Sequence, residues 1–160
     1  MKRMHLHLGV DDMEQSIAFY STLFAAEPTV RKDDYAKWML EDPRVNFAIT
    51  PTTHTARGIE HIGIQVENID ELNEVGDRLK SAGRQVLEEA ATTCCYAQSS
   101  KNWITDPDGV IWETFLTTGS STDYGNKEPV LTGMAQLAAL ETAKAEDSAA
   151  GSCCTPSTIT

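Results

Sequence analysis

Two adjacent cysteines, Cys94 and Cys95, lie in the polar stretch TTCCYAQSS of this 160-residue chain. Neighbouring Cα atoms are about 3.8 Å apart, closer than the roughly 4.4 Å or more that a disulfide prefers, so a bond within the pair would be strained. Thiolates are the ligands that soft centres select. The two thiols can converge on one centre only where the backbone leaves the extended geometry, since successive strand side chains point to opposite faces. The pair therefore predicts a soft-ligand site in a loop; the alternative is two small buried apolar residues.

A metal site is predicted from an internal repeat. The segment 5–30 aligns without gaps on the segment 61–86, and His5 falls on His61. Two strands related in this way would bring both imidazoles into one cleft. The last apolar segment, VIWETF, aligns on VNFAIT and places Glu113 opposite Ala48. Two imidazoles and one carboxylate with open positions suit non-haem Fe(II) acting on dioxygen, although Mn, Co, Ni or Zn also fits such a set.

Each of these three residues taken alone is more often structural or exposed than a ligand, and it is their coincidence at matched repeat positions that favours a metal site. His7 and His54 have no partner in the repeat. His7 shares strand parity with His5, so it is expected beside the site or at the surface, without a role as a ligand.

The elements that must position these residues follow the repeat. Alternating apolar residues predict strands at 4–10 and 60–66, and helices with a 3.6-residue period follow each of them. Asp12 and Asn68 are the expected N-caps, and the helices should end before Pro28 and near Gly83. Further strands are expected at 29–32, 36–41, 44–50, 84–88, 101–105 and 110–117. The fold class is α+β, with two βαβββ modules at about 1–56 and 57–118 and a mobile, largely disordered tail at 119–160.

Composition excludes several function classes. The net charge of −11 leaves no basic face for nucleic acid and would be repelled by an anionic membrane. No apolar run is long enough to span a bilayer or to serve as a signal peptide, so we expect a cytoplasmic protein. Reduced cysteines are the rule in that compartment. The tail carries a second pair, Cys153 and Cys154, to which the sequence assigns no role.

These motifs resemble a known superfamily. The pattern from His5 to Tyr20 and the motif DPDGVIWE are similar to the vicinal oxygen chelate superfamily, which includes glyoxalases, bleomycin-resistance proteins and extradiol dioxygenases. Within it, TTCCYAQSSKNWITDPDGVIWE resembles the carbon–arsenic lyases and the related cadmium-induced proteins. The resemblance implies metal ligands at His5, His61 and Glu113, a substrate-binding pair at Cys94–Cys95, and a substrate-contacting or charge-stabilising role for Lys101; an exposed lysine at a strand start is the alternative.

The activity implied by the resemblance is that of an Fe(II)-dependent dioxygenase. Such an enzyme would cleave the carbon–arsenic bond of trivalent organoarsenicals, converting methylarsenite to arsenite and formaldehyde in organoarsenical detoxification. Its partners would be the small arsenical and dioxygen, in a monomer or a homodimer. Two alternatives stay open: a non-catalytic cadmium- or arsenite-binding protein, and another glyoxalase- or extradiol-type metalloenzyme. Glyoxalase-like members use a further glutamate in the fourth strand, where this sequence has Ala48.

Overall fold

The computed structural model describes residues 1–125 and confirms two βαβββ modules. The first module consists of β1 (Arg3–Val10), α1 (Met13–Phe24), β2 (Val30–Lys32), β3 (Tyr35–Glu41) and β4 (Arg44–Pro51). The second consists of β5 (Gly58–Val66), α2 (Ile69–Ser81), β6 (Leu87–Cys94), β7 (Ala97–Thr105) and β8 (Ile111–Ser120). The α+β fold class read from the repeat is therefore confirmed.

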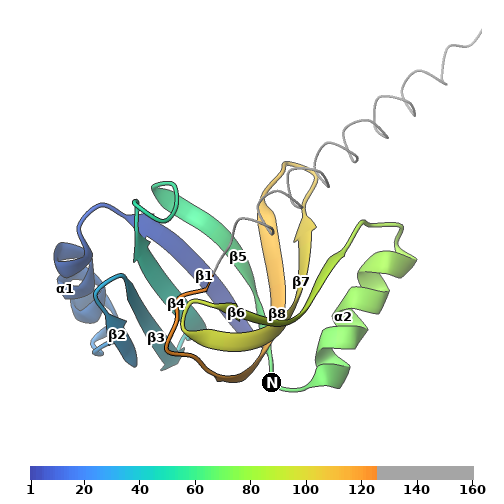
Figure 1. The fold of residues 1–160 in the computed structure, drawn as a ribbon, viewed down its shortest axis with the longest axis horizontal. Helices are drawn as coiled ribbons and strands as arrows, with labels where there is room; N and C mark the ends of the chain where they lie inside the picture. The colour runs from blue at the N-terminus through green and yellow to red at the C-terminus, as the bar shows by residue number, and fades with distance from the viewer. Residues whose placement is uncertain (126–160) are drawn as a thin grey trace, which may run out of the picture.

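All described strands join one curled sheet in the order β2-β3-β4-β1-β5-β8-β7-β6. The modules meet at the antiparallel pair β1–β5, and each of these two strands pairs in parallel with the last strand of its own module, β4 or β8. Figure 1 shows α1 and α2 on the outside of the sheet at its opposite ends. The first strands of the two modules thus lie side by side at the centre, as the repeat predicts.

Both predicted N-caps are present. The side chains of Asp12 and Asn68 accept hydrogen bonds from the main-chain N–H groups of Gln15 and Glu71, each at 2.9 Å. The first helix ends at Phe24, after which Ala25 takes a left-handed conformation with φ 50°. These caps satisfy helix-end groups that would otherwise lack partners, and so fix where each helix starts against the sheet.

The core and the candidate site occupy opposite faces of β1. Its even-numbered residues, such as Leu6 and Leu8, pack toward α1 against a buried cluster that includes Ile17, Trp38 and Phe47. Its odd-numbered residues, such as His5 and His7, are also buried but face a pocket on the inner side of the curl. Fully burying one large apolar side chain stabilises the fold by about 1.5–3 kcal/mol, so the helix-facing layer holds the sheet in its curled shape.

The predicted loop around the cysteines is the main difference between the expected and the observed elements. The expected strands 84–88 and 101–105 are instead the long hairpin strands β6 and β7, joined by a turn at Cys95–Tyr96. The residues that the second module has in addition to the first therefore lengthen the β6–β7 hairpin. The polar, non-alternating composition of 89–100 gave no strand signal, because both strands lie at the outer side of the sheet, where β6 is the edge.

The last strand also runs further than expected. β8 continues to Ser120, two residues into the region expected to be tail, and residues 121–125 follow it along the hairpin turn. The rest of the expected tail, 126–160, lies outside the described residues, as do Cys153 and Cys154. Neither helix within 1–125 combines the length and the apolar character needed to cross a bilayer.

Candidate metal and thiol site

The three predicted metal ligands come from three adjacent strands. In the sheet register His5 of β1 lies opposite Gly63 of β5, which lies opposite Glu113 of β8. Neighbouring strands are about 4.8 Å apart, so the two outer residues of this row start about 10 Å apart. Gly63 has no side chain, and a Cβ there would lie 2.2 Å from the Glu113 carbonyl oxygen. The glycine allows this close strand approach and leaves the space over which the outer side chains converge.

The three side chains meet at one point. His5 Nε2 lies 3.1 Å from His61 Nε2, and Glu113 Oε2 lies 3.7 Å from the former and 3.3 Å from the latter. Nitrogen and oxygen ligands bind first-row metals at about 2.0–2.2 Å, so neighbouring ligands of one ion lie roughly 3.0–3.6 Å apart. The two separations from His61 Nε2 fall in that range, and the 3.7 Å between His5 Nε2 and Glu113 Oε2 lies just beyond it. The donor set is therefore suited to a divalent metal in both chemistry and geometry.

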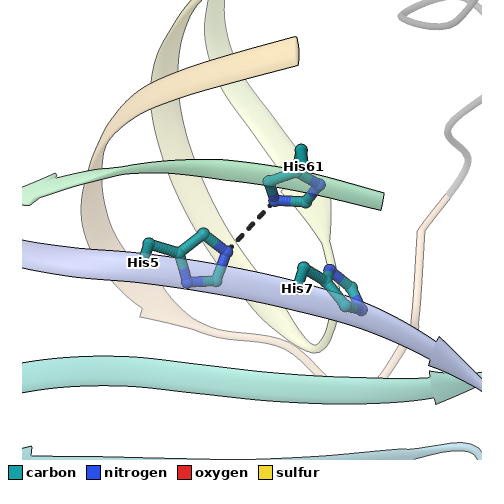
Figure 2. A group of neighbouring side chains, drawn as sticks. All are labelled: His5, His7 and His61. Carbon is teal, nitrogen blue, oxygen red and sulfur yellow. Dashed lines mark hydrogen bonds between the residues drawn. The ribbon is translucent and has the colours of Figure 1, made fainter. Parts of the chain in front are cut away.

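A third histidine joins this group, which the sequence did not assign as a ligand. One ring nitrogen each from His5, His7 and His61 lie within 4.8 Å of one another, and all three residues are buried. Figure 2 shows His5 and His7 projecting from β1 toward His61 on β5. His7 is buried, so the expected surface position is wrong, and its place among residues that could hold a metal differs from the expectation that it has no role as a ligand. Its parity with His5 was the signal that pointed here.

A glutamate beside these rings was missed. His7 pairs with His61, but Leu8 pairs with Ile59, so Glu60 is an extra residue on β5 and forms a β-bulge. A bulge re-aims a side chain, and Glu60 lines the same pocket as its neighbour His61. Its Oε2 lies 3.2 Å from His7 Nδ1 and 3.3 Å from His61 Nδ1. Strand alternation would have placed it on the opposite face.

Both histidines predicted as ligands, His5 and His61, are oriented through their outer nitrogens. His5 Nδ1 lies 3.0 Å from the main-chain oxygen of Asn46, to which a protonated Nδ1 donates, and His61 Nδ1 faces the Glu60 carboxylate. Hydrogen bonds of this kind fix the tautomer in which Nε2 carries the lone pair. Both Nε2 atoms therefore point to the centre at which a metal would bind.

Lys101 is a buried partner of Glu113, in contrast to the exposed lysine of the alternative reading. Its Nζ lies 2.6 Å from Glu113 Oε1 and 5.2 Å from the centre of the Trp103 ring, on the neighbouring side of the pocket. Glu113 Oε1 thus pairs with the ammonium, while Oε2 faces the histidines. This division leaves one carboxylate oxygen for a metal and one for the lysine.

Burial and charge set the protonation states. Burial, with the adjacent His61, lowers the pKa of His5 to about 3. Burial would raise the pKa of Glu113, but Lys101 and His61 hold it well below its usual range. Burial would lower the pKa of His61, but hydrogen bonds to Glu113 and Glu60 raise it. At neutral pH the site therefore has a carboxylate and a neutral His5, the forms that bind metals, whereas the raised pKa of His61 means that a metal would displace a proton from this ring.

The vicinal thiols converge at the tip of the β6–β7 hairpin. Cys94 Sγ and Cys95 Sγ lie 3.0 Å apart, which exceeds the roughly 2.0 Å of a disulfide bond. Cys95 and Tyr96 form the two-residue turn, with φ of 55° and 61°. Positive φ at both central positions is the type I′ turn, which usually takes Asn-Gly and costs about 1–2 kcal/mol for each ordinary residue. The departure from extended backbone that convergent thiols require is thus present.

The thiols and the metal donors line one pocket. Cys94 and Cys95 lie on its wall together with His5, His61 and Glu113. Tyr35, Lys37, Trp103 and Phe115 are also on the wall, as is Lys101, which pairs with Glu113. In Figure 1 the hairpin strand β6 passes across the sheet toward the first module, and a bulge at Ala91 bends it. A molecule held by the thiols would therefore face the metal donors.

Comparison with known proteins bears directly on this arrangement. Residues 2–114 match the family model of the Glyoxalase/Bleomycin resistance protein/Dioxygenase superfamily. The chain belongs to this superfamily. Among solved structures, the Mn(II)-bound glyoxalase of Novosphingobium aromaticivorans shares its fold, with a TM-score of 0.53 and 18% identity over 80% of this chain and 44% of that chain.

Two superfamily relatives confirm the resemblance to carbon–arsenic lyases and cadmium-induced proteins. The trivalent organoarsenical cleaving enzyme of Bacillus sp. (strain MD1) is 45% identical over 73% of this chain and 74% of its own length. Cadmium-induced protein CadI of Mycobacterium tuberculosis (strain ATCC 25618 / H37Rv) is 36% identical over 79% of this chain and 83% of its own length. Superfamily membership and the buried histidine group together support a metal-dependent enzyme.

Proposed function

We propose that this chain is an Fe(II)-dependent dioxygenase that cleaves the carbon–arsenic bond of trivalent organoarsenicals. The observation that carries the proposal is the shared pocket of two vicinal thiols and a two-histidine, one-carboxylate donor set. A donor set of this kind with open positions suits non-haem Fe(II), and the thiols suit trivalent arsenic. The name of the Bacillus relative, an organoarsenical cleaving enzyme, points to the same substrate class.

The thiols bind and orient the substrate in this proposal. A monosubstituted trivalent arsenical has two exchangeable oxygens and one carbon on arsenic, so Cys94 and Cys95 replace both oxygens and leave the carbon–arsenic bond presented. One thiol would leave the arsenical free to rotate about a single bond. Two fix its direction toward the metal donors, which is the entropic contribution of positioning.

His5, His61 and Glu113 would hold the metal, and Lys101 keeps Glu113 ionised for that purpose. When bound, Fe(II) supplies the activation of dioxygen. Trp103 and Phe115 give the pocket apolar walls that limit access of water. The atoms balance, since one methylarsenite and one dioxygen contain the atoms of one arsenite and one formaldehyde. The reduced thiols that this binding requires are kept by the cytoplasm, which is the location we propose.

The test is single-turnover chemistry on the full chain. The protein is loaded anaerobically with Fe(II), methylarsenite is added and then air, and arsenic species, formaldehyde and oxygen uptake are measured. Replacing Cys94 or Cys95 by Ser should abolish turnover and leave Fe(II) binding intact, whereas Glu113→Ala should remove both. Turnover that persists in Cys94→Ser would exclude the two-thiol binding mode.

The same experiment separates the alternatives. A non-catalytic cadmium- or arsenite-binding protein would retain the arsenical without consuming oxygen or forming formaldehyde. A glyoxalase- or extradiol-type enzyme would show activity that is independent of both cysteines. Ala48, which lies on β4 opposite His7, provides no fourth carboxylate for a glyoxalase-type ligand set.

A further inference from the structure

The hairpin that carries the thiols has its tip on the other module. Tyr96, the second residue of the turn, donates a hydrogen bond from its hydroxyl to Asp34 Oδ1 at 2.6 Å. Asp34 belongs to the short turn between β2 and β3 of the first module, 62 positions earlier in the chain. This bond raises the pKa of Tyr96 to about 12. A charge-assisted bond thus links the thiol turn to a turn of the first module.

A second support comes from the chain that follows β8. The N–H group of Cys95 donates to the Tyr124 carbonyl oxygen at 2.6 Å, and the N–H group of Ser121 donates to the Tyr96 carbonyl oxygen at 2.8 Å. The Tyr124 hydroxyl lies 3.1 Å from Thr50 Oγ1. The Thr50 hydroxyl in turn donates a hydrogen bond to the main-chain oxygen of Asp34 at 3.0 Å. Both supports therefore lead back to the same turn of the first module.

The tyrosine rings close the contact around the turn. Tyr35, Tyr96 and Tyr124 lie in mutual ring contact, with centroid separations of 6.0, 6.4 and 5.7 Å. Tyr35 also lines the pocket beside the thiols. The left-handed turn is a strained conformation, and such conformations persist where the surroundings over-determine them. The contacts of Tyr96 with Asp34, Tyr35 and Tyr124 provide that constraint.

We propose that Asp34 is a positioning residue for the thiol pair, acting through the Tyr96 hydroxyl to hold Cys94 and Cys95 convergent at the pocket. The inference rests on the proposed function for its substrate, a trivalent arsenical, and on geometry alone for its mechanism. Without the bond, the turn loses its fixed orientation over the pocket. The second thiol is then held less well beside an arsenic already bound to the first, so two-point capture weakens.

Three variants of the full chain test this role, with a fourth as a control. Tyr96→Phe removes only the hydroxyl, and Asp34→Ala removes the acceptor. Asp34→Asn keeps an acceptor oxygen and should fall between Asp34→Ala and the wild type. The matched control is Tyr20→Phe, because this tyrosine packs on the helix side of the sheet against Phe47, away from the thiols.

The first measurement is amide hydrogen exchange without metal or arsenical. The exchange of Cys95 and Ser121 should speed up about tenfold in Tyr96→Phe and Asp34→Ala, because one charge-assisted bond of the turn is lost. The amides that pair β1 with β5 should not change. Uniform acceleration across the sheet, or no acceleration at the turn, would overturn the positioning role, since either result leaves Tyr96 without a specific effect on the thiols.

The second measurement is the binding of phenylarsine oxide to the metal-free chain under nitrogen, followed by protein fluorescence, with Cys153 and Cys154 replaced by Ser in every protein compared so that Cys94–Cys95 is the vicinal pair measured. The dissociation constant should rise about tenfold in Tyr96→Phe and Asp34→Ala, less in Asp34→Asn, and not in Tyr20→Phe. In methylarsenite turnover, the weaker binding should appear as a higher KM, and so as a lower rate at low substrate concentration. Equal affinities in all variants would refute the proposal.

Failure of the inference is distinguishable from failure of the proposed function. If the wild type releases no arsenite but the exchange and binding shifts are seen, the dioxygenase assignment fails and the positioning role stands. If the wild type turns over methylarsenite and the variants match it in exchange and affinity, the reverse holds.

Discussion

Replacing Lys101 by Met tests the central electrostatic feature of the site. The substitution keeps an unbranched side chain shorter by one heavy atom and removes the charge, so it leaves the buried Glu113 carboxylate without its cation. At the observed 2.6 Å and an effective dielectric constant near 20, the pair attracts by about 6 kcal/mol. Desolvation of both ions offsets much of this, and breaking a buried pair by removing one partner typically costs about 3–5 kcal/mol.

We therefore expect the unfolding free energy of the metal-free Lys101→Met variant to fall by about 3–5 kcal/mol in urea titrations with a chelator present. The double variant Lys101→Met/Glu113→Gln should be more stable than Lys101→Met, because it has no unpaired buried charge. Saturation with a divalent metal should stabilise Lys101→Met more than the wild type, since the ion would supply the missing positive charge beside Glu113.

Two results would refute this reasoning. One is a metal-free Lys101→Met variant as stable as the wild type, which would mean that the carboxylate is solvated or protonated without the lysine. The other is a double variant no more stable than Lys101→Met, which would assign the loss to packing of the long side chain and not to charge.

Three further predictions concern the row of metal donors. Gly63→Ala should cost about 1–3 kcal/mol in urea unfolding, because its Cβ meets the main chain of β8, whereas Gly119→Ala should change little; equal effects would contradict the close-approach argument. Glu60→Gln should weaken metal binding about 10–100-fold by calorimetry, since it loosens the orientation of His61, and unchanged affinity would exclude that role. Because the pKa of His5 is about 3 in the folded chain and near 6.5 in the unfolded chain, only the unfolded chain is protonated at this position between these values. The contribution of neutral His5 to the unfolding free energy is therefore complete above about pH 6.5 and is lost as the pH falls toward 3. With a chelator present, the unfolding free energy of His5→Gln should change with pH less steeply than that of the wild type in this range, by up to about 1.4 kcal/mol per pH unit. Identical slopes would refute the assignment.

The repeat made the centre of the fold predictable. Matching His5 with His61 placed two strands in equivalent positions, and the structure pairs those strands at the module boundary. The N-caps at Asp12 and Asn68 were predictable because capping depends on residues within one turn of the chain. Both predictions required only local patterns and one offset.

The rest of the site depends on features without a local signal. Glu60 reaches the pocket because of a bulge, and simple alternation assigns it to the wrong face. The hairpin around Cys94 has a polar sequence that resembles a loop, and its strands form by tertiary pairing, β7 with β8 and β6 with β7. The contact between Tyr96 and Asp34 joins residues of different modules, so only the tertiary structure brings them together.

The two halves of the pocket rest on different foundations. The imidazole and carboxylate donors are built into the middle strands of the sheet, whereas the sulfur atoms project from a hairpin at its outer side that is held by loops. An exchange of that hairpin, together with the loops beneath it, would alter which molecule is captured and leave the central row of donors in place. One scaffold of this design is thereby able to act on many substrates, because the donors for the metal lie in the sheet and the residues that select the substrate lie on the hairpin.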